Sequence, residues 1–251
     1  MKVTQYVVTH KDCEHLKNKT YIGVGGNELK DVLIYDHIGD NISNKNKNYC
    51  ELTALYWIYK NDKTSEIISF EHYRRMFYKG LRINYLNKKD IEMIFNKGYD
   101  IILPKENTTD IFHKNNIYKL FSLDHYKEDL DLCREAISNL YPEYLSSFDN
   151  VIYGFKMTYF NMFITTKELL DNYAKWIFNV FDYVENRIDL KGRTDYQKRA
   201  FGFLGERLFN VWLKHQNLKI KRMKVTFEGH HEIAWRSNEI FEFIKHGIIR
   251  K

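Results

Sequence analysis

The chain has 251 residues, of which 44% are hydrophobic, 29% charged and 16% aromatic, a composition that excludes disordered and collagen-like chains. With only two prolines and 12 glycines there is no Pro-rich linker or Gly/Ser hinge, so we expect one continuous domain. A formal charge of +6 favours anionic partners such as phosphates, nucleotides or an anionic membrane, but is too small for a dedicated nucleic-acid binder.

Strand-like and helix-like segments alternate along the chain. Apolar runs bounded by polar turns predict strands over residues 3–8, 21–24, 32–35, 66–70, 100–103, 156–165 and 218–225. Apolar residues at helical spacing predict helices over 49–61, 89–96, 127–140, 169–184 and 196–215, and after His231. This alternation predicts an α/β fold with a largely parallel central sheet flanked by helices.

The three cysteines, Cys13, Cys50 and Cys133, lie far apart without a Cys-x-x-Cys pair. This spacing argues against a zinc ribbon or a disulfide framework and favours a reducing compartment. No apolar stretch approaches the roughly 18 residues of a membrane span. We therefore expect a cytoplasmic protein.

Polar clusters follow several of the predicted strands, at Thr9–Lys11, Asp40–Asn41 and His72–Arg75. Since ligands of parallel sheets bind beyond the carboxyl ends of the strands, these clusters should meet on one rim. Two arginines beside a histidine suit a diphosphate, although a solvated strand end whose arginines pair with Glu71 or another carboxylate is an open alternative. Asp40 and Asn41 could hold a ribose or sugar hydroxyl, or form an ordinary turn.

Asp129-Leu130-Asp131 spells the Asp-x-Asp pattern with which many sugar-nucleotide transferases hold a divalent cation. The pattern lies inside a predicted helix, where residues two apart point in roughly opposite directions. We interpret it as a decoy and predict no metal site. A divalent metal bound by carboxylates elsewhere on the rim stays open.

The last long predicted helix carries Arg199, Gly202 and Glu206 on one stripe. Glycines at 202 and 205 cost helix stability, which indicates close approach by another backbone or a substrate. Glu206 is therefore a candidate general base, and Asp195, just ahead of the helix, is the runner-up. Surface pairing with neighbouring arginines is the alternative for Glu206.

A basic stretch over 214–224 could face lipid phosphates and hold the protein at the inner face of the plasma membrane, although a solvated face is favoured. Its basic residues are Lys214, Lys219, Lys221, Arg222 and Lys224. Most aromatic residues recur at helical core spacing, so we expect no nucleic-acid partner.

Six blocks in order carry a resemblance to a known family over nearly the whole chain. They are Val8–Lys11, Gly39–Ser43, Asn48–Trp57, His72–Arg75, Tyr159–Ile164 and Phe201–Leu208. In these blocks the chain resembles bacterial polysaccharide-biosynthesis glycosyltransferases catalogued as domain of unknown function 4422 and associated with glycosyltransferase family 111. Phe70-Glu71 departs from the small residue and cysteine expected before His72.

The resemblance implies a GT-A-like single domain over residues 1–251, with a nucleotide-binding part over about 1–105 and an acceptor-side part over about 106–251. It implies transfer of galactofuranose from a UDP-sugar to a cell-surface or capsular polysaccharide or glycolipid acceptor, and His72–Arg75 would replace the usual metal. Donor-lining residues would be Thr9, His10, Asp40, Asn41, Glu51, His72, Arg74 and Arg75. Asn161 and Arg199 would lie near the sugar or the acceptor, and Glu206 would be the base of an inverting reaction. A non-catalytic glycan-binding or scaffold protein of the same fold is the competing hypothesis.

Overall fold

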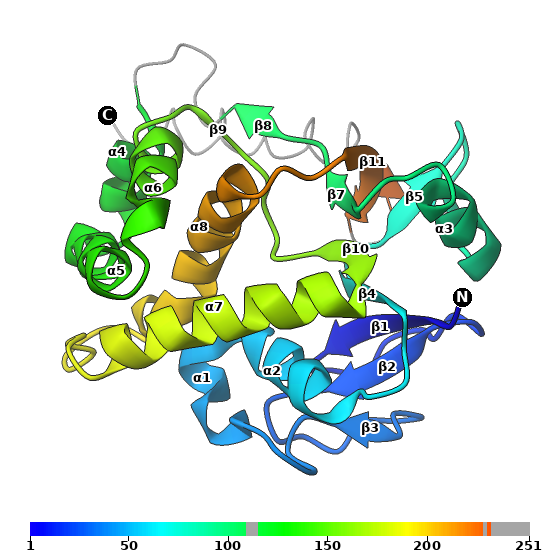
Figure 1. The fold of residues 1–251 in the computed structure, drawn as a ribbon. Helices are drawn as coiled ribbons and strands as arrows, with labels where there is room; N and C mark the ends of the chain where they lie inside the picture. Colours follow the sequence, from blue (N-terminus) through cyan, green and yellow to red (C-terminus); the bar gives the residue numbers. More distant parts are fainter. Residues whose placement is uncertain (109–114, 228–229, 232–251) are drawn as a thin grey trace, which may run out of the picture.

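The computed structural model describes residues 1–108, 115–227 and 230–231 (Figure 1). The helical tail predicted after His231 lies outside this part of the chain. The main sheet has the strand order β3-β2-β1-β4-β10-β7-β11-β5-β6, with β12 paired to β11. Its strands are β1 (Val3–Thr9), β2 (Thr20–Gly23), β3 (Ile34–Tyr35), β4 (Ile67–His72), β5 (Phe77–Lys79), β6 (Asn84–Tyr85), β7 (Ile101–Pro104), β10 (Phe163–Thr166), β11 (Ile220–Phe227) and β12 (His230–His231).

The sheet is mixed rather than largely parallel. Strands β1 to β4 are parallel, and so are β7 and β11, but β10 runs antiparallel between β4 and β7, and β5 runs antiparallel to β11. The prediction of a largely parallel sheet is therefore wrong. Apolar runs identify strands but carry no information on their direction, which depends on how the connecting segments return to the sheet.

Helices pack against the sheet and against one another to close the core. They are α1 (Asn46–Tyr49), α2 (Leu52–Asn61), α3 (Lys88–Phe95), α4 (Ile117–Asp124), α5 (Lys127–Leu140), α6 (Leu145–Ile152), α7 (Lys167–Glu185) and α8 (Ala200–His215). Short 3₁₀ turns are η1 (Ser43–Lys45), η2 (Pro142–Tyr144) and η3 (Gln197–Arg199), and β8 (Asn107–Thr108) pairs with β9 (Lys156–Met157). The long helix α7 lies along α2 and α8, while α4, α5 and α6 gather at one end of the molecule (Figure 1).

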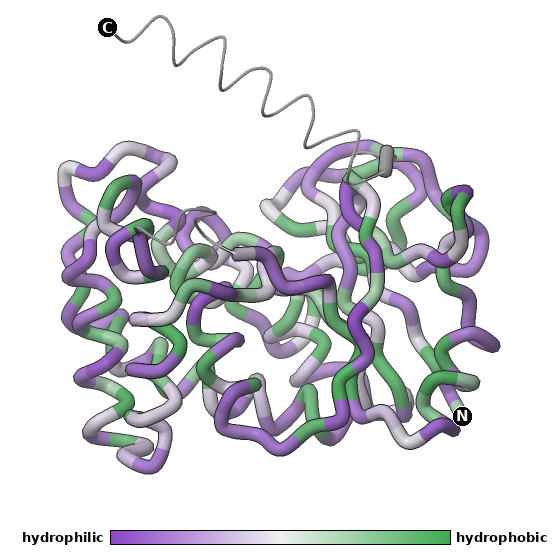
Figure 2. Tube along the Cα trace, turned by 90° about the horizontal axis from the view of Figure 1, so that it is seen from above, coloured by the Kyte–Doolittle hydropathy of each residue, from purple (hydrophilic) through white to green (hydrophobic). Residues whose placement is uncertain are grey.

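Hydrophilic residues interrupt the hydrophobic ones throughout the helices (Figure 2). Within the described ranges, no helix is both long and apolar enough to cross a membrane.

Two predicted elements are interrupted where the backbone adopts positive φ. The helix predicted over 49–61 breaks at Cys50, with φ 53° and ψ −130°, into α1 and α2. The strand predicted over 156–165 divides into β9 and β10, because Phe160 and Asn161 have φ of 83° and 44°. Such backbone angles are costly outside glycine and cluster at functional sites. An apolar pattern gives no sign of either break.

Helix α8 approaches the α1–α2 bend so closely that two of its positions have little room for a side chain. A Cβ at Gly205 would lie 2.8 Å from Leu52 Cδ1, and one at Gly202 would lie 3.0 Å from Cys50 Sγ. The close approach inferred from these glycines is thus confirmed, and the neighbour is another helix of the chain. It brings the beginning of α2 and the middle of α8 to the same place.

Substitution of Gly205 by alanine should destabilise the protein. In an open helix this change stabilises by about 1 kcal/mol, but here the methyl group overpacks against buried Leu52, at a cost of about 1–3 kcal/mol. Urea unfolding should give a lower free energy of unfolding for Gly205→Ala. Combining it with Leu52→Ala should give less destabilisation than the sum of the two single changes. A stabilised Gly205→Ala protein would contradict the tight contact.

Candidate active site

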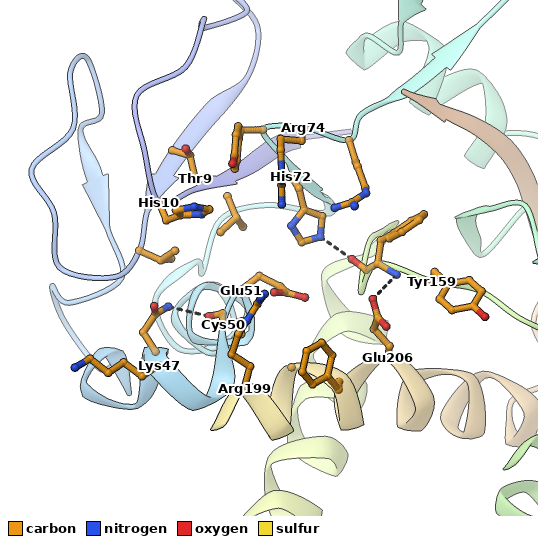
Figure 3. Close-up of a pocket in the computed structure, with 18 of the residues that line it drawn as sticks. Thr9, His10, Lys47, Cys50, Glu51, His72, Arg74, Tyr159, Arg199 and Glu206 are labelled. Carbon is orange, nitrogen blue, oxygen red and sulfur yellow. Dashed lines mark hydrogen bonds between the residues drawn. The ribbon is translucent and has the colours of Figure 1, made fainter. Parts of the chain in front are cut away.

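A cavity of about 700 Å³ opens at the carboxyl ends of β1 and β4 and is closed on its other side by α1, the α1–α2 bend and α8 (Figure 3). The residues that line it are Val8, Thr9, His10, Val24, Asn46, Lys47, Cys50, Glu51, His72, Tyr73, Arg74, Arg75, Tyr159, Phe160, Tyr196, Arg199, Gly202, Phe203 and Glu206. They come from both halves of the sequence. The cavity therefore requires the complete fold.

A tight turn presents the arginines at the end of β4. The amide of His72 donates to the Arg75 carbonyl at 3.1 Å, and the amide of Arg75 donates to the His72 carbonyl at 2.9 Å. The amide of Tyr73 donates to the Val8 carbonyl at 3.0 Å, which fixes the turn to β1. The Arg75 guanidinium carbon lies 4.3 Å from the centre of the Phe160 ring. Glu71, the alternative partner considered for the arginines, is buried and forms an ion pair with Lys19.

Positive charge exceeds negative charge in the cavity lining. Lys47, Arg74, Arg75 and Arg199 supply four cations against the two carboxylates of Glu51 and Glu206, an excess of two. Burial, with neighbouring arginines, lowers the pKa of both lining histidines, and that of His72 falls to about 4. The histidines are therefore neutral at neutral pH and add nothing to this charge.

The bend at Phe160–Asn161 contacts three of the lining side chains. The Phe160 carbonyl accepts a hydrogen bond from His72 Nε2 at 2.6 Å, and the Phe160 amide donates to Glu206 Oε1 at 2.9 Å (Figure 3). Asn161 Nδ2 donates to Glu51 Oε1 at 2.9 Å and to the Gly202 carbonyl at 3.2 Å. Two consecutive residues in left-handed conformation thus hold the end of β4, the beginning of α2 and the middle of α8 together.

Both carboxylates of the cavity are easier to protonate than an exposed glutamate. Burial is the largest cause and raises the pKa of Glu51 and of Glu206. The negative charge of Glu51 raises the pKa of Glu206 further, whereas the Arg207 guanidinium, 2.9 Å from Glu206 Oε2, lowers it. A carboxylate with a raised pKa is a better acceptor for a proton at neutral pH.

Cys50 is a poor nucleophile despite its place in the lining. Burial raises the pKa of its thiol to about 11, and Sγ accepts a hydrogen bond from Arg199 Nε at 3.2 Å. Because the thiolate is the reactive form, this cysteine is unreactive at neutral pH. Its contact instead positions Arg199 beside the cavity.

The structure brings together eight of the residues singled out in the sequence. These are Thr9, His10, Glu51, His72, Arg74, Arg75, Arg199 and Glu206. Asn161 is 3% exposed and lies behind the lining, where it binds Glu51 rather than facing the cavity.

Three other candidates lie outside the cavity lining. The Asp195 side chain is fully exposed, 3.9 Å from Lys198 Nζ. Asp40 is exposed beside Lys60 and accepts a hydrogen bond from the Tyr56 hydroxyl at 3.3 Å. Asn41 stabilises its own loop, as its side chain bonds the carbonyls of His37 and Gly39 and the amide of Ser43. The predicted rim thus lacks the Asp40–Asn41 cluster, because that loop folds back on itself.

The Asp-x-Asp carboxylates point to different partners, as their helical spacing predicts. Asp129 is buried and forms a bidentate pair with Arg193, at 2.6 and 2.8 Å. Asp131 is exposed and accepts hydrogen bonds from the Tyr118 hydroxyl. Residues 1–108, 115–227 and 230–231 contain no group of three or more His, Cys, Asp or Glu side chains placed to hold a metal ion.

Sequence reasoning assigned no role to Lys47, Tyr159, Tyr196 and Phe203, which also line the cavity. Tyr196 and Phe203 stand three residues before Arg199 and three before Glu206, so the helical stripe could have revealed them. Tyr159 lies in one of the blocks that carry the family resemblance, and for Lys47 we find no such signal.

Fold and site together define an α/β domain with a cationic cavity at the carboxyl ends of its strands, lined by two partly buried carboxylates. The chain belongs to the family described as domain of unknown function DUF4422, whose model matches residues 4–217. It is similar to a solved structure described as the WbbM bifunctional glycosyltransferase in its apo form, with a TM-score of 0.79 and 27% sequence identity. The match covers 92% of this chain and 46% of that one, so this chain spans about half of that protein's length. Curated protein sequences give no match. The chain is therefore a glycosyltransferase-like domain.

The lowered pKa of His72 should make stability fall in mild acid. Its pKa is about 4 in the folded chain and about 6.5 when unfolded. Between these values the unfolded chain binds more protons, so the free energy of unfolding falls as the pH falls from about 6.5 towards 4. From pH 7 to pH 5 this amounts to about 2 kcal/mol.

Urea unfolding at both pH values measures this contribution. His72→Asn removes the titrating group, so the variant should lose about 2 kcal/mol less than the wild type on acidification. The comparison cancels the other titrating groups of the cavity. Equal losses in the two proteins would mean that the pKa of His72 is not lowered in the folded chain.

Proposed function

We propose that this chain is a GT-A-like glycosyltransferase domain that moves a sugar, galactofuranose in our proposal, from a UDP-sugar to a hydroxyl of a growing polysaccharide or glycolipid. The observation that carries the proposal is the cavity, in which an excess of two positive charges lies beside two carboxylates with raised pKa. Similarity to the WbbM glycosyltransferase supports the class of reaction. The acceptor is a cell-surface or capsular glycan, and the contact of the domain with an anionic membrane is part of the same proposal.

The charge of the cavity matches that of a nucleotide sugar. The diphosphate bridge of a UDP-sugar carries two negative charges, and bidentate arginines are well suited to phosphate oxygens. Arg74 and Arg75 follow β4, where the GT-A fold usually places a metal-binding Asp-x-Asp. In our proposal these arginines, with Arg199 and Lys47, neutralise the diphosphate as it leaves.

In this proposal the two parts of the chain bind different substrates. We assign the nucleotide to residues 1–105, where Thr9, His10, Arg74 and Arg75 line the cavity, and the acceptor to residues 106–251. Asp40 and Asn41 have no role in this assignment because they lie outside the lining.

Glu206 is the proposed general base of an inverting transfer. The acceptor oxygen attacks the anomeric carbon and forms the new glycosidic bond while its proton passes to the Glu206 carboxylate. The bond from the anomeric carbon to the UDP oxygen breaks, and UDP departs with the electron pair. Burial of Glu206 keeps it basic enough for this step at neutral pH.

A screen of UDP-sugars, including the furanose form of UDP-galactose, tests the proposal by the release of UDP. A glycan-binding or scaffold protein of the same fold would release none. Binding separates the cases further, because UDP above its dissociation constant should raise the melting temperature of a nucleotide-dependent enzyme and leave a scaffold unchanged.

Loss of either arginine of the β4 turn should weaken nucleotide binding. Removing a charge-assisted contact costs about 1.5–3 kcal/mol, or roughly ten- to a hundredfold in affinity. Calorimetric titration of Arg74→Ala and Arg75→Ala with UDP measures the effect, and Arg134→Ala, on the exposed surface of α5, is the matched control. Unchanged affinity in both cavity variants would refute the diphosphate assignment.

Transfer should persist without a divalent metal. The four cations of the cavity take the place of the metal charge, so a chelator should reduce turnover less than about twofold. UDP release measured with chelator, manganese and magnesium decides the matter. Activity that disappears in chelator and returns with metal would require a carboxylate-bound ion.

Glu206→Gln should reduce turnover by about 10²- to 10⁴-fold, because it keeps the shape of the base and removes its basicity. Affinity for UDP and the melting temperature should change little. Asp195→Asn tests the runner-up, whose exposed position predicts wild-type turnover. A loss of rate in Asp195→Asn but not in Glu206→Gln would reverse the assignment, and a product with retained anomeric configuration would exclude the inverting mechanism.

A further inference from the structure

His72 faces the cavity as a hydrogen-bond acceptor. A carbonyl oxygen can only accept, so the 2.6 Å contact with Phe160 places the imidazole proton on Nε2. The other ring nitrogen, Nδ1, is then a lone-pair acceptor. No residue of the described chain donates a hydrogen bond to Nδ1. Since Nδ1 lacks a partner but is not fully buried, it is open to the cavity that His72 lines. Burial and Arg75 keep the ring neutral by lowering its pKa to about 4.

Glu51 is a second acceptor in the same wall. Its carboxylate receives the Asn161 side-chain amide at 2.9 Å and its own backbone amide. A carboxylate offers about four acceptor positions, so this leaves about two for a ligand in the cavity that Glu51 lines. Unlike Glu206, which is paired with Arg207, Glu51 has no ion pair with any described residue.

The Phe160–Asn161 bend places these two acceptors next to the proposed base. His72 is bound by the carbonyl of Phe160, Glu206 by the amide of the same residue, and Glu51 by the side chain of the following one. The charge of Glu206 acts on His72, and the charge of Glu51 acts on Glu206, so the three groups share one neighbourhood. A ligand part held there lies beside the reacting centre.

A lone pair and a carboxylate repel phosphate oxygens and attract hydrogen-bond donors. Neither the diphosphate nor the carbonyl groups of the uracil ring can donate a hydrogen bond to these two acceptors, whereas hydroxyl groups can. We propose that His72 Nδ1 and the Glu51 carboxylate form a subsite that accepts hydrogen bonds from two hydroxyls of the transferred sugar. This inference rests on the proposed function and names His72 and Glu51 as residues that select a sugar with both hydroxyls free.

Calorimetric binding of UDP and of UDP-galactofuranose to three variants tests the subsite. His72→Leu and Glu51→Gln should each lower the affinity for UDP-galactofuranose about ten- to a hundredfold and change the affinity for UDP less than twofold. Glu51→Gln replaces an acceptor oxygen on the cavity side with an amide group that donates hydrogen bonds. His72→Asn should retain much of the affinity, because its side-chain oxygen can take the place of Nδ1 and its amide can donate to Phe160.

His37→Leu and Glu135→Gln, both outside the cavity lining, are the matched controls. A second arm leaves the protein unchanged and uses deoxyfluoro analogues of UDP-galactofuranose, in which fluorine replaces one hydroxyl and cannot donate. One analogue should bind the wild type at least tenfold more weakly than the parent sugar nucleotide, and this penalty should vanish in Glu51→Gln or His72→Leu.

If the variants lose affinity for UDP and for UDP-galactofuranose equally, His72 and Glu51 bind the ribose hydroxyls, and the proposed subsite is overturned. Analogues that all bind the wild type as well as the parent would overturn it as well. So would His72→Asn behaving like His72→Leu while both stay folded. A wild-type protein that binds neither UDP nor UDP-galactofuranose would instead refute the proposed function.

Discussion

The hydrogen bonds of the Phe160–Asn161 bend hold the site together. A residue in a left-handed backbone conformation is costly unless the surroundings fix it, and here two follow one another. The surroundings are His72 from the end of β4, Glu51 from the beginning of α2 and Glu206 with Gly202 from α8. Two consecutive residues thus link side chains from three separate elements.

The same contacts explain how two carboxylates and one histidine persist at partly buried positions. Each buried polar group needs a partner, since an unsatisfied one costs about 1–3 kcal/mol. The bend supplies a carbonyl for His72 and amides for Glu51 and Glu206, while the arginines around the cavity offset the negative charge. Burial raises the pKa of both glutamates and lowers that of His72, whereas the hydrogen bonds of the bend act against these shifts.

Regular elements and strand-end clusters were accessible from the sequence, whereas the bends were not. The helix predicted over 127–140 coincides with α5, and the cluster at His72–Arg75 does line the cavity. Residues 156–165 look like one strand because their side chains are apolar and β-branched, and that pattern is blind to the positive φ at Phe160. Asn161 consequently looked like a substrate contact, although it binds Glu51. The direction of each strand was equally hidden in the sequence. A largely parallel sheet was therefore expected, although β10 runs antiparallel to β4.

The tight packing of α8 against α2 separates the parts of the cavity wall that evolution can alter from those that it cannot. Gly202 and Gly205 leave little room for a side chain, so a larger residue at either position would press against Cys50 or Leu52 and disturb the helix that carries Glu206. Tyr196, in contrast, is 53% exposed at the mouth of the same wall, ahead of the helix. Related chains that bind different ligands in this cavity should therefore keep the two glycines and diverge at the position of Tyr196.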